Sequence, residues 1–497
     1  MSEEFSPDSD RPDASSRRPN IVLVLTDDHA AHAIGAYGSV VNRTPRIDEI
    51  ADRGWRFDNC FATNSLCSPS RASILTGTHS HVNGVKTLSM DIDAYQPTFI
   101  TQLGKVGYRT AMIGKWHLGQ GQGHNPEGFD YWDVLISQGE YHDPQFLSKD
   151  GVRIVPGYAT DIITDLAINW VESLEGDEPW CMLVYHKAPH RPWEPDAAHA
   201  EMYSDPIPVP ATFTDDYKTR TSSARRSTLR VADHLDFGDL KQDPPPGLDY
   251  EQEALWKYQR YMEDYLRCVA SVDDNVGRLT DWLDARGEFD DTVMMYSSDQ
   301  GFFLGDHGWF DKRFMYEESI RMPLVMSYPR ALASGRVHDG IITNVDFARS
   351  ILDAAQASPH PRMQGRSFWP DIVIDSTDAP DPEPPAAGFY YRYWEHEGGH
   401  NVPGHYGYRD QRYKIIYFYN DGMCLPGTGQ FYYSGEWELY DLQQDPDELR
   451  NVFYDSAYRE VRDRLITDLA NAQRAVGDSP HPNQKVVPVP PTDSESS

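Results

Sequence analysis

The segment Asn20-Ile-Val-Leu-Val-Leu-Thr26 decides the fold class. It is a short, uninterrupted apolar run, without the polar alternation of a strand that faces water on one side. Such a run is typical of a strand buried on both faces. Asp27 and Asp28 follow it directly. The segment therefore predicts a central strand with an acidic pair at its carboxyl end, although such a pair alone is usually only a turn.

Similar apolar runs are separated by segments with helical periodicity. The clearest helical segment is Leu255–Leu283, where apolar residues return every three or four positions. Strands that alternate with helices predict an α/β fold, here a large mixed, mostly parallel sheet sandwiched by helices. The further runs are Tyr108–Ile113, Trp180–Tyr185, Thr292–Ser297 and Pro323–Ser327.

Composition divides the chain into two folded units with three accessory segments. An aromatic-rich part with strand-like runs and a helix near 456–476 predicts a small C-terminal α+β domain with an antiparallel sheet. Segments rich in Pro, Ser and Asp predict disordered ends and a linker. The expected segments are 1–19 (disordered), 20–374 (main α/β domain), 375–387 (linker), 388–479 (C-terminal domain) and 480–497 (disordered tail).

Charge and hydropathy exclude several functions. The formal net charge of −32 repels nucleic acid and anionic lipid, so we expect neither as a partner. No apolar run reaches the roughly 18 residues that a membrane span needs. No apolar stretch precedes the first strand, so we expect a cytoplasmic protein without a signal peptide. The five cysteines are scattered without CxxC spacing and predict reduced thiols.

The string Cys67-Ser-Pro-Ser-Arg-Ala-Ser-Ile-Leu-Thr-Gly77 carries the chemistry. Pro69 suits the first turn of a helix and Gly77 its end. Cys67 would then lie at a helix N-terminus, where free N–H groups favour an anion. A lone cysteine before a helix is more often a small buried residue, so this position alone leaves both readings open.

The full string resembles the signature of type I sulfatases, which belong to the alkaline phosphatase superfamily. The resemblance implies a sulfuric ester hydrolase whose sulfatase domain is 20–374. It further implies that a maturation enzyme oxidises Cys67 to formylglycine (3-oxoalanine), and that Arg71 clamps this group. Every fixed position of the signature is met, by Cys67, Pro69, Ser70, Arg71, Leu75, Thr76 and Gly77.

Two acidic motifs predict a metal site. Asp27 and Asp28 follow the first strand, and Asp299 and Gln300 follow the strand at Thr292–Ser297. Together they offer three carboxylates and one amide oxygen, a set that suits Ca²⁺ first and Mg²⁺ second. In type I sulfatases matching pairs hold the metal together with the formylglycine at the position of Cys67. Many members have Asn at the position of Gln300, whereas a subset of carbohydrate sulfatases has Gln.

Three further motifs follow predicted strands. The resemblance implies that Lys115 and Lys312 contact the sulfate, that His117 contacts the formylglycine hydroxyl, and that His190 lies on the leaving-group side. We expect His186 to be structural. Asp306 and His307 stay open between a role in the site and bracing of their loop. The motifs are Gly114-Lys-Trp-His-Leu-Gly119, Lys187-Ala-Pro-His190 and Gly305-Asp-His-Gly-Trp-Phe-Asp-Lys312.

The aromatic C-terminal part resembles glycan sulfatases of the N-acetylglucosamine-6-sulfatase type. The resemblance implies a small sulfated saccharide substrate, with a 6-O-sulfate on N-acetylglucosamine or a related carbohydrate. His405 and Arg409 would then contact sugar hydroxyls at the mouth of the site, although a purely structural role on a strand is equally open.

Two alternatives stay open at this stage. One is a phosphomonoester or phosphonate-ester hydrolase of the same superfamily, and the other is a catalytically silent sulfoglycan-binding protein. The sequence does not indicate the oligomeric state, or endo or exo action.

Overall fold

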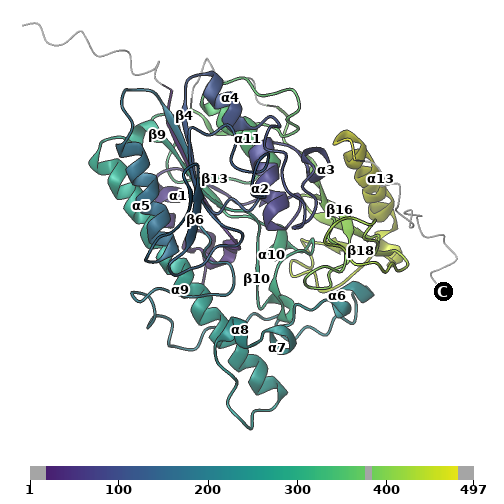
Figure 1. Cartoon of the computed structure of the whole chain (residues 1–497). Helices are drawn as coiled ribbons and strands as arrows, with labels where there is room; N and C mark the ends of the chain where they lie inside the picture. Colours follow the sequence, from purple (N-terminus) through teal and green to yellow (C-terminus); the bar gives the residue numbers. More distant parts are fainter. Residues whose placement is uncertain (1–17, 375–382, 479–497) are drawn as a thin grey trace, which may run out of the picture.

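The computed structural model of the chain describes residues 18–374 and 383–478. Residues 1–17 of the N-terminal segment predicted to be disordered, the predicted tail 480–497 and most of the predicted linker lie outside these residues. A ten-stranded sheet forms the larger part of the molecule, in the order β13-β2-β12-β9-β1-β8-β4-β5-β6-β7. The predicted class, a mostly parallel sheet between helices with a smaller antiparallel sheet, is confirmed (Figure 1).

Five neighbouring strands in the middle of this sheet run parallel to one another. They are β1 (Asn20–Thr26), β4 (Arg109–Gly114), β5 (Tyr131–Leu135), β8 (Trp180–Tyr185) and β9 (Thr292–Ser298). Antiparallel strands flank this block on both sides. The outer strands are β2 (Trp55–Phe57), β12 (Leu324–Ser327) and β13 (Arg336–His338) on one side, and β6 (Gln145–Ser148) and β7 (Gly151–Ile154) on the other.

Helices cover both faces of the sheet, which explains the uninterrupted apolar run in β1. Val22 and Val24 pack into one core, and Ile21, Leu23 and Leu25 into the other. The first core is closed by α1 (Pro45–Asp52), α5 (Ala159–Glu172) and α9 (Tyr250–Ala285). The second core is closed by α2 (Cys67–Thr76), α4 (Phe99–Lys105) and α11 (Phe347–Ala354) (Figure 1).

The helix α9 is longer than the predicted segment Leu255–Leu283 and spans 36 residues. It begins at a cap in which the Asp249 carboxylate accepts a hydrogen bond from the backbone N–H of Gln252. Within the described ranges, no helix combines the length and the apolarity required to cross a membrane.

The remaining elements are short. The strands are β3 (Cys60–Phe61), β10 (Phe303–Leu304), β11 (Phe310–Asp311) and β14 (Ile342–Thr343). The α-helices are α3 (Ser80–Asn83), α6 (Ser222–Arg226), α7 (Val231–His234), α8 (Phe237–Leu240), α10 (Glu317–Ile320) and α12 (Trp369–Ile372). The 3₁₀ turns are η2 (Ala31–Ala33), η3 (Gly35–Tyr37), η4 (Phe289–Asp291), η5 (Asp306–Gly308), η6 (Asn344–Asp346) and η7 (Ser456–Tyr458).

Residues 388–478 build the smaller antiparallel sheet. Phe389, Tyr391 and Tyr393 face the main part of the chain, whereas Tyr390 faces the terminal helix. This alternation explains the aromatic composition, because both faces of the sheet are covered. The elements are β15 (Gly388–Tyr393), β16 (His405–Asp410), β17 (Tyr413–Phe418), β18 (Glu436–Asp441) and α13 (Arg459–Ala475).

A buried ion pair fixes the end of α13 to this sheet. The Asp478 carboxylate accepts hydrogen bonds from Arg392 and from the Tyr390 hydroxyl, each at 2.6 Å. Both charged side chains are 2% exposed. Asp478→Ala would leave the Arg392 guanidinium buried without its counter-ion. We expect the free energy of unfolding to fall by about 3–5 kcal/mol, measured by urea denaturation.

A matched control comes from the exposed pair Arg464–Asp468 on α13, whose side chains are 46% and 31% exposed. Asp468→Ala is expected to change stability by less than about 1 kcal/mol. Equal effects of the two substitutions would contradict the assigned role of Asp478.

Candidate active site

Four of the parallel strands end at one edge of the sheet and deliver polar side chains there. Asp27 follows β1, Lys115 follows β4, His190 lies beyond β8, and Asp299 follows β9. The carboxyl ends of parallel strands are where open α/β sheets build their sites. The residues predicted from widely separated motifs therefore meet at one place.

Three carboxylates form the centre of this site. One oxygen from each of Asp27, Asp28 and Asp299 lies within 4.8 Å of the others. All three side chains are completely buried. Three buried negative charges at this separation require positive charge close by.

Three cationic side chains provide that charge. Each of them forms an ion pair with at least one carboxylate. Arg71, which is 1% exposed, has a further partner, since its Nη1 donates to the backbone carbonyl of Lys115 at 2.6 Å. The ion pairs are Arg71 Nε with Asp299 Oδ2 at 2.9 Å, Lys312 Nζ with Asp28 Oδ2 at 2.7 Å, and Lys115 Nζ with Asp27 Oδ2. Three carboxylates and three cations leave the centre formally neutral.

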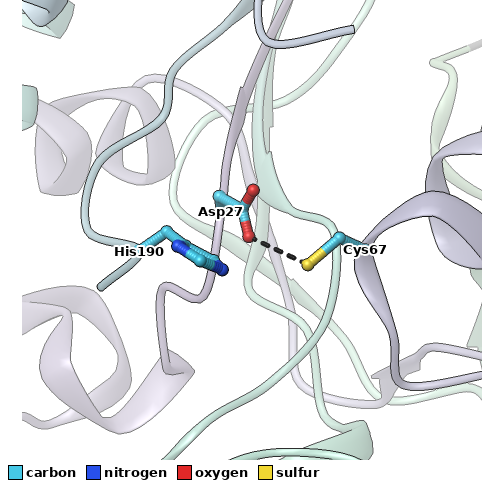
Figure 2. A group of neighbouring side chains, drawn as sticks. All are labelled: Asp27, Cys67 and His190. Carbon is cyan, nitrogen blue, oxygen red and sulfur yellow. Dashed lines mark hydrogen bonds between the residues drawn. The ribbon is translucent and has the colours of Figure 1, made fainter. Parts of the chain in front are cut away.

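Cys67 begins α2, as the sequence predicts, and Gly77 ends this helix with a positive φ of 63°. The Cys67 thiol donates to Asp27 Oδ1 at 3.3 Å. Figure 2 shows the Asp27 carboxylate between the imidazole of His190 and the Cys67 sulfur. Burial raises the pKa of the Cys67 thiol well above its usual value.

Gln300 lies against the same centre. Its Nε2 donates to Asp28 Oδ1 at 2.6 Å and lies 3.6 Å from the Cys67 sulfur. Its Oε1 is buried and has no hydrogen-bond partner among the described residues. A half-turn of the amide would direct this orphaned oxygen at the carboxylates, as a cation site would require. The donor set is then oxygen-only and fits a hard divalent cation.

The pKa values of the three carboxyls are shifted in different directions. Burial raises the pKa of Asp28 to about 7 and that of Asp299 to about 6. Burial would also raise the pKa of Asp27, but Lys115, His190 and Arg71 outweigh it and hold this pKa well below its usual range. A divalent cation would stabilise all three groups in the charged form.

Two histidines, His190 and His117, lie near this centre. His190 Nε2 lies 3.8 Å from Asp28 Oδ2, and its Nδ1 lies 2.6 Å from the carbonyl of Arg191, to which it can only donate. The backbone carbonyl of His117 accepts a hydrogen bond from the Ser68 hydroxyl at 2.7 Å. Burial, with Lys115 as the next cause, lowers the pKa of both imidazoles well below the usual value.

Two residues of the site, like fifteen other non-glycine residues of the described chain, have a left-handed backbone conformation. Asp28 and His117 adopt positive φ angles of 69° and 54°, which non-glycine residues rarely do. The Tyr265 hydroxyl of α9 donates to the carbonyl of Asp28 at 2.8 Å and accepts from the N–H of Ala30 at 2.9 Å. Strained residues held in this way are typical of functional sites.

Known families and relatives match this chain over most of its length. The sulfatase family profile matches residues 19–357, and a profile described as "N-sulphoglucosamine sulphohydrolase, C-terminal" matches residues 305–475. An N-acetylglucosamine-6-O-sulfatase of Bacteroides thetaiotaomicron is 41% identical over 515 residues, which covers 95% of this chain and 88% of that protein.

The chain belongs to the sulfatase family.

It is therefore a sulfuric ester hydrolase, and the family generally uses a formylglycine and a divalent metal. A solved structure of a protein in complex with its substrate D-glucosamine-2-N,6-O-disulfate matches with a TM-score of 0.85 at 39% identity. That match covers 94% of this chain and all of the other. A phosphonate monoester hydrolase of Agrobacterium radiobacter matches at 20% identity with a TM-score of 0.70, over 92% and 96% of the chains. At that identity the likeness shows the fold alone.

Two predicted substrate residues of this sulfatase do not lie at an exposed mouth. His405 is completely buried among aromatic rings that include Tyr391 and Phe418, and its Nδ1 is paired with the carbonyl of Pro403. Arg409 is 4% exposed and donates twice to the Glu317 carboxylate, at 3.1 Å each. Their burial favours the structural alternative, in which both side chains pack between the antiparallel sheet and the segment that carries Phe314 and Glu317.

Asp306 and His307, whose roles the sequence left open, both have partners that stabilise their loop. Asp306 pairs with His32 at 3.2 Å, and His307 is completely buried and pairs with Asp215 at 3.1 Å. Both brace the loop after β10. His186 is completely buried, and burial lowers its pKa to about 3, as expected of a structural histidine.

Sequence reasoning missed Gln138. Its Oε1 accepts a hydrogen bond from Lys115 Nζ at 2.5 Å. Gln138 lies beyond the carboxyl end of β5, the parallel strand next to β4. A signal would have been the short apolar-rich run Tyr131–Leu135, which was not recognised as a strand of the same sheet.

Proposed function

We propose that this sulfatase hydrolyses the 6-O-sulfate ester of N-acetylglucosamine or a related glucosamine unit in a small saccharide. One observation carries this proposal: the 41% identity to an N-acetylglucosamine-6-O-sulfatase extends over 95% of the chain. The structural neighbour whose substrate carries a 6-O-sulfate on glucosamine supports it.

We further propose that Asp27, Asp28, Asp299 and Gln300 hold Ca²⁺, and that a maturation enzyme converts Cys67 to formylglycine. The orphaned Gln300 oxygen and the clustered carboxylates support the metal ligands. When present, the cation supplies positive charge to the sulfate oxygens, and the hydrated aldehyde supplies a nucleophilic hydroxyl with a second hydroxyl for product release.

Charge balance suits an anionic substrate. The three carboxylates and three cations cancel, so a bound divalent cation would leave two net positive charges. A sulfate monoester carries one negative charge on its non-bridging oxygens. The ammonium groups of Lys115 and Lys312 lie on two sides of the carboxylate cluster and are placed to stabilise these oxygens.

Proton transfer is assigned to the two histidines. A neutral His117 can accept a proton at the side of residue 67, and the low pKa of its imidazole favours this neutral form. Because His190 Nδ1 donates to the Arg191 carbonyl, its Nε2 carries a proton only in the imidazolium form. Burial and Lys115 lower the pKa of this imidazole as well, so His190 can act as proton donor to the leaving alcohol only when the bound sulfate anion raises that pKa.

A substrate panel tests the proposed function. We expect kcat/KM on N-acetylglucosamine-6-sulfate to exceed that on the 3-sulfate and on galactose-6-sulfate by at least about tenfold, because the sugar pocket must match both ring and position. An aryl sulfate and the matching aryl phosphate are measured beside them. A preference for phosphate would favour the alternative of a phosphoester hydrolase, and a preference for another sugar or position would refute the proposed substrate.

A further inference from the structure

A cavity of about 390 Å³ opens beside the site and is called the lateral pocket. It is bounded by Ser68, Leu88, Asp91, His117, Gln120 and Leu147. Ser68 and His117 belong to the site already described, so the cavity is continuous with it. Its volume is within the roughly 300–1,000 Å³ that small-molecule sites usually have.

Unpaired polar groups line part of the lateral pocket. Asp91, Gln120 and Ser137 are exposed and border the cavity, and within the described part of the chain their side chains make no hydrogen bond or ion pair with other protein groups. Apolar surface comes from Leu88 and Leu147. A sugar ring has polar edges and apolar C–H faces, so it would satisfy both kinds of lining.

Hydrogen bonds of one carboxylate connect the wall of the lateral pocket to the loop that carries Lys312. The N–H of Leu88 donates to Glu395 Oε2 at 3.0 Å, and Glu395 Oε1 accepts from Arg313 Nη1 at 3.0 Å. Arg313 directly follows Lys312. One carboxylate of the C-terminal part therefore holds both the pocket wall and the loop that carries Lys312.

Charge restricts what the pocket can accept. Among the described residues that line it there is no lysine or arginine, and Asp91 contributes a carboxylate. A uronate or a second sulfate placed there would meet this carboxylate without a counter-ion. The net charge of −32 adds to that repulsion.

We propose that the lateral pocket is a subsite for an uncharged sugar unit joined to the sulfated sugar. This rests on the proposed function and narrows it to saccharides in which the 6-sulfated glucosamine unit neighbours a neutral hexose. Saccharides with a neighbouring hexuronate are the disfavoured class.

Three 6-O-sulfated N-acetylglucosamine substrates test this subsite: the monosaccharide, a disaccharide with a neutral hexose, and the same disaccharide with a hexuronate. We expect kcat/KM for the neutral disaccharide to be about tenfold above that for the monosaccharide, because the added hydroxyls find partners. The hexuronate form is expected at least about fivefold below the neutral one. Asp91→Asn should bring the kcat/KM values for the neutral and the hexuronate disaccharides closer together. The control Asp93→Asn, at an exposed acid outside the lining, should leave their ratio unchanged.

A blocking variant gives a second readout. Gln120 is exposed, so Gln120→Trp can fill the pocket without disturbing the core, and it should remove the advantage of the neutral disaccharide. Gln122→Trp, on the same exposed loop but outside the lining, is the matched control. The monosaccharide can be cleaved while Asp91→Asn and Gln120→Trp change neither the ratio of kcat/KM for the neutral disaccharide to that for the monosaccharide nor its ratio to that for the hexuronate form. That result would overturn the subsite and leave the proposed function standing. Cleavage of none of the three substrates would overturn both.

Discussion

Replacing Cys67 by alanine is expected to abolish sulfate ester hydrolysis, with kcat/KM falling by at least about 10⁴-fold. The sulfur atom lies against Asp27 and Gln300 beside the carboxylate cluster, so the substitution removes the proposed nucleophile from the site. The fold should persist, because the substitution removes a single buried atom. The measurement is kcat/KM on an aryl sulfate, together with the midpoint of thermal unfolding.

Cys60→Ala is the control for this substitution, since Cys60 is equally buried but lies on β3 in the apolar core. It should lose some stability and keep activity. Mass spectrometry of the peptide that contains residue 67 completes the test. An aldehyde at that position accords with the enzyme, whereas a plain thiol after co-expression with a maturation enzyme favours the alternative of a silent sulfoglycan-binding protein. Full activity of Cys67→Ala would refute the assignment.

The second large effect is expected for Asp27→Asn. This change keeps the shape of the side chain but removes one carboxylate charge from the proposed cation site, and it leaves Lys115 and Arg71 with excess positive charge. We expect kcat/KM to fall by about 10³-fold. Calcium affinity, measured by isothermal titration, should fall with it.

Asp346→Asn is the control for Asp27→Asn, because it also removes a buried carboxylate charge but does so away from the proposed cation site. Asp346 is also buried, but its carboxylate accepts from the N–H groups of Thr343 and Arg366 away from the site. We expect this variant to lose stability without a change in calcium affinity. If the Asp27→Asn protein binds calcium with unaltered affinity, Asp27 is not a ligand. If the unsubstituted protein keeps its activity after prolonged chelation, the proposed cation site is refuted.

The central strands and the metal-site motifs could be predicted because each leaves a strong local signal. β1 and β9 are covered on both faces, so their apolar runs are unbroken, and a polar pair marks the end of each. The Cys67 string holds its helix start, its helix end and its chemistry within eleven residues. For these segments, local pattern and tertiary environment agree.

The two strands at one edge of the sheet, β6 and β7, could not be predicted for the opposite reason. All four residues of β7 are exposed, and β6 is only partly buried, so neither has an apolar pattern. Gln138 was missed with them because its role depends on β5 lying next to β4. Position along the chain does not reveal such a neighbour.

His405 and Arg409 show a different limit. They are four residues apart on β16 and so face the same side of the sheet, which the sequence indicates. What it does not indicate is that this side packs on the larger part of the chain, where Phe61 lies under the Arg409 guanidinium. A polar residue on a strand is read as facing water unless the covering surface is known.

The burial of residue 67 has a consequence for how the protein is made. Its side chain is 1% exposed in the finished fold, and it lies beneath the ends of strands that come from both halves of the main sheet. In the folded chain that atom is closed to a second enzyme. The proposed conversion of Cys67 to the aldehyde would therefore have to take place before the fold is complete. The active fraction of a preparation would then be decided by timing in the cell and not by later treatment.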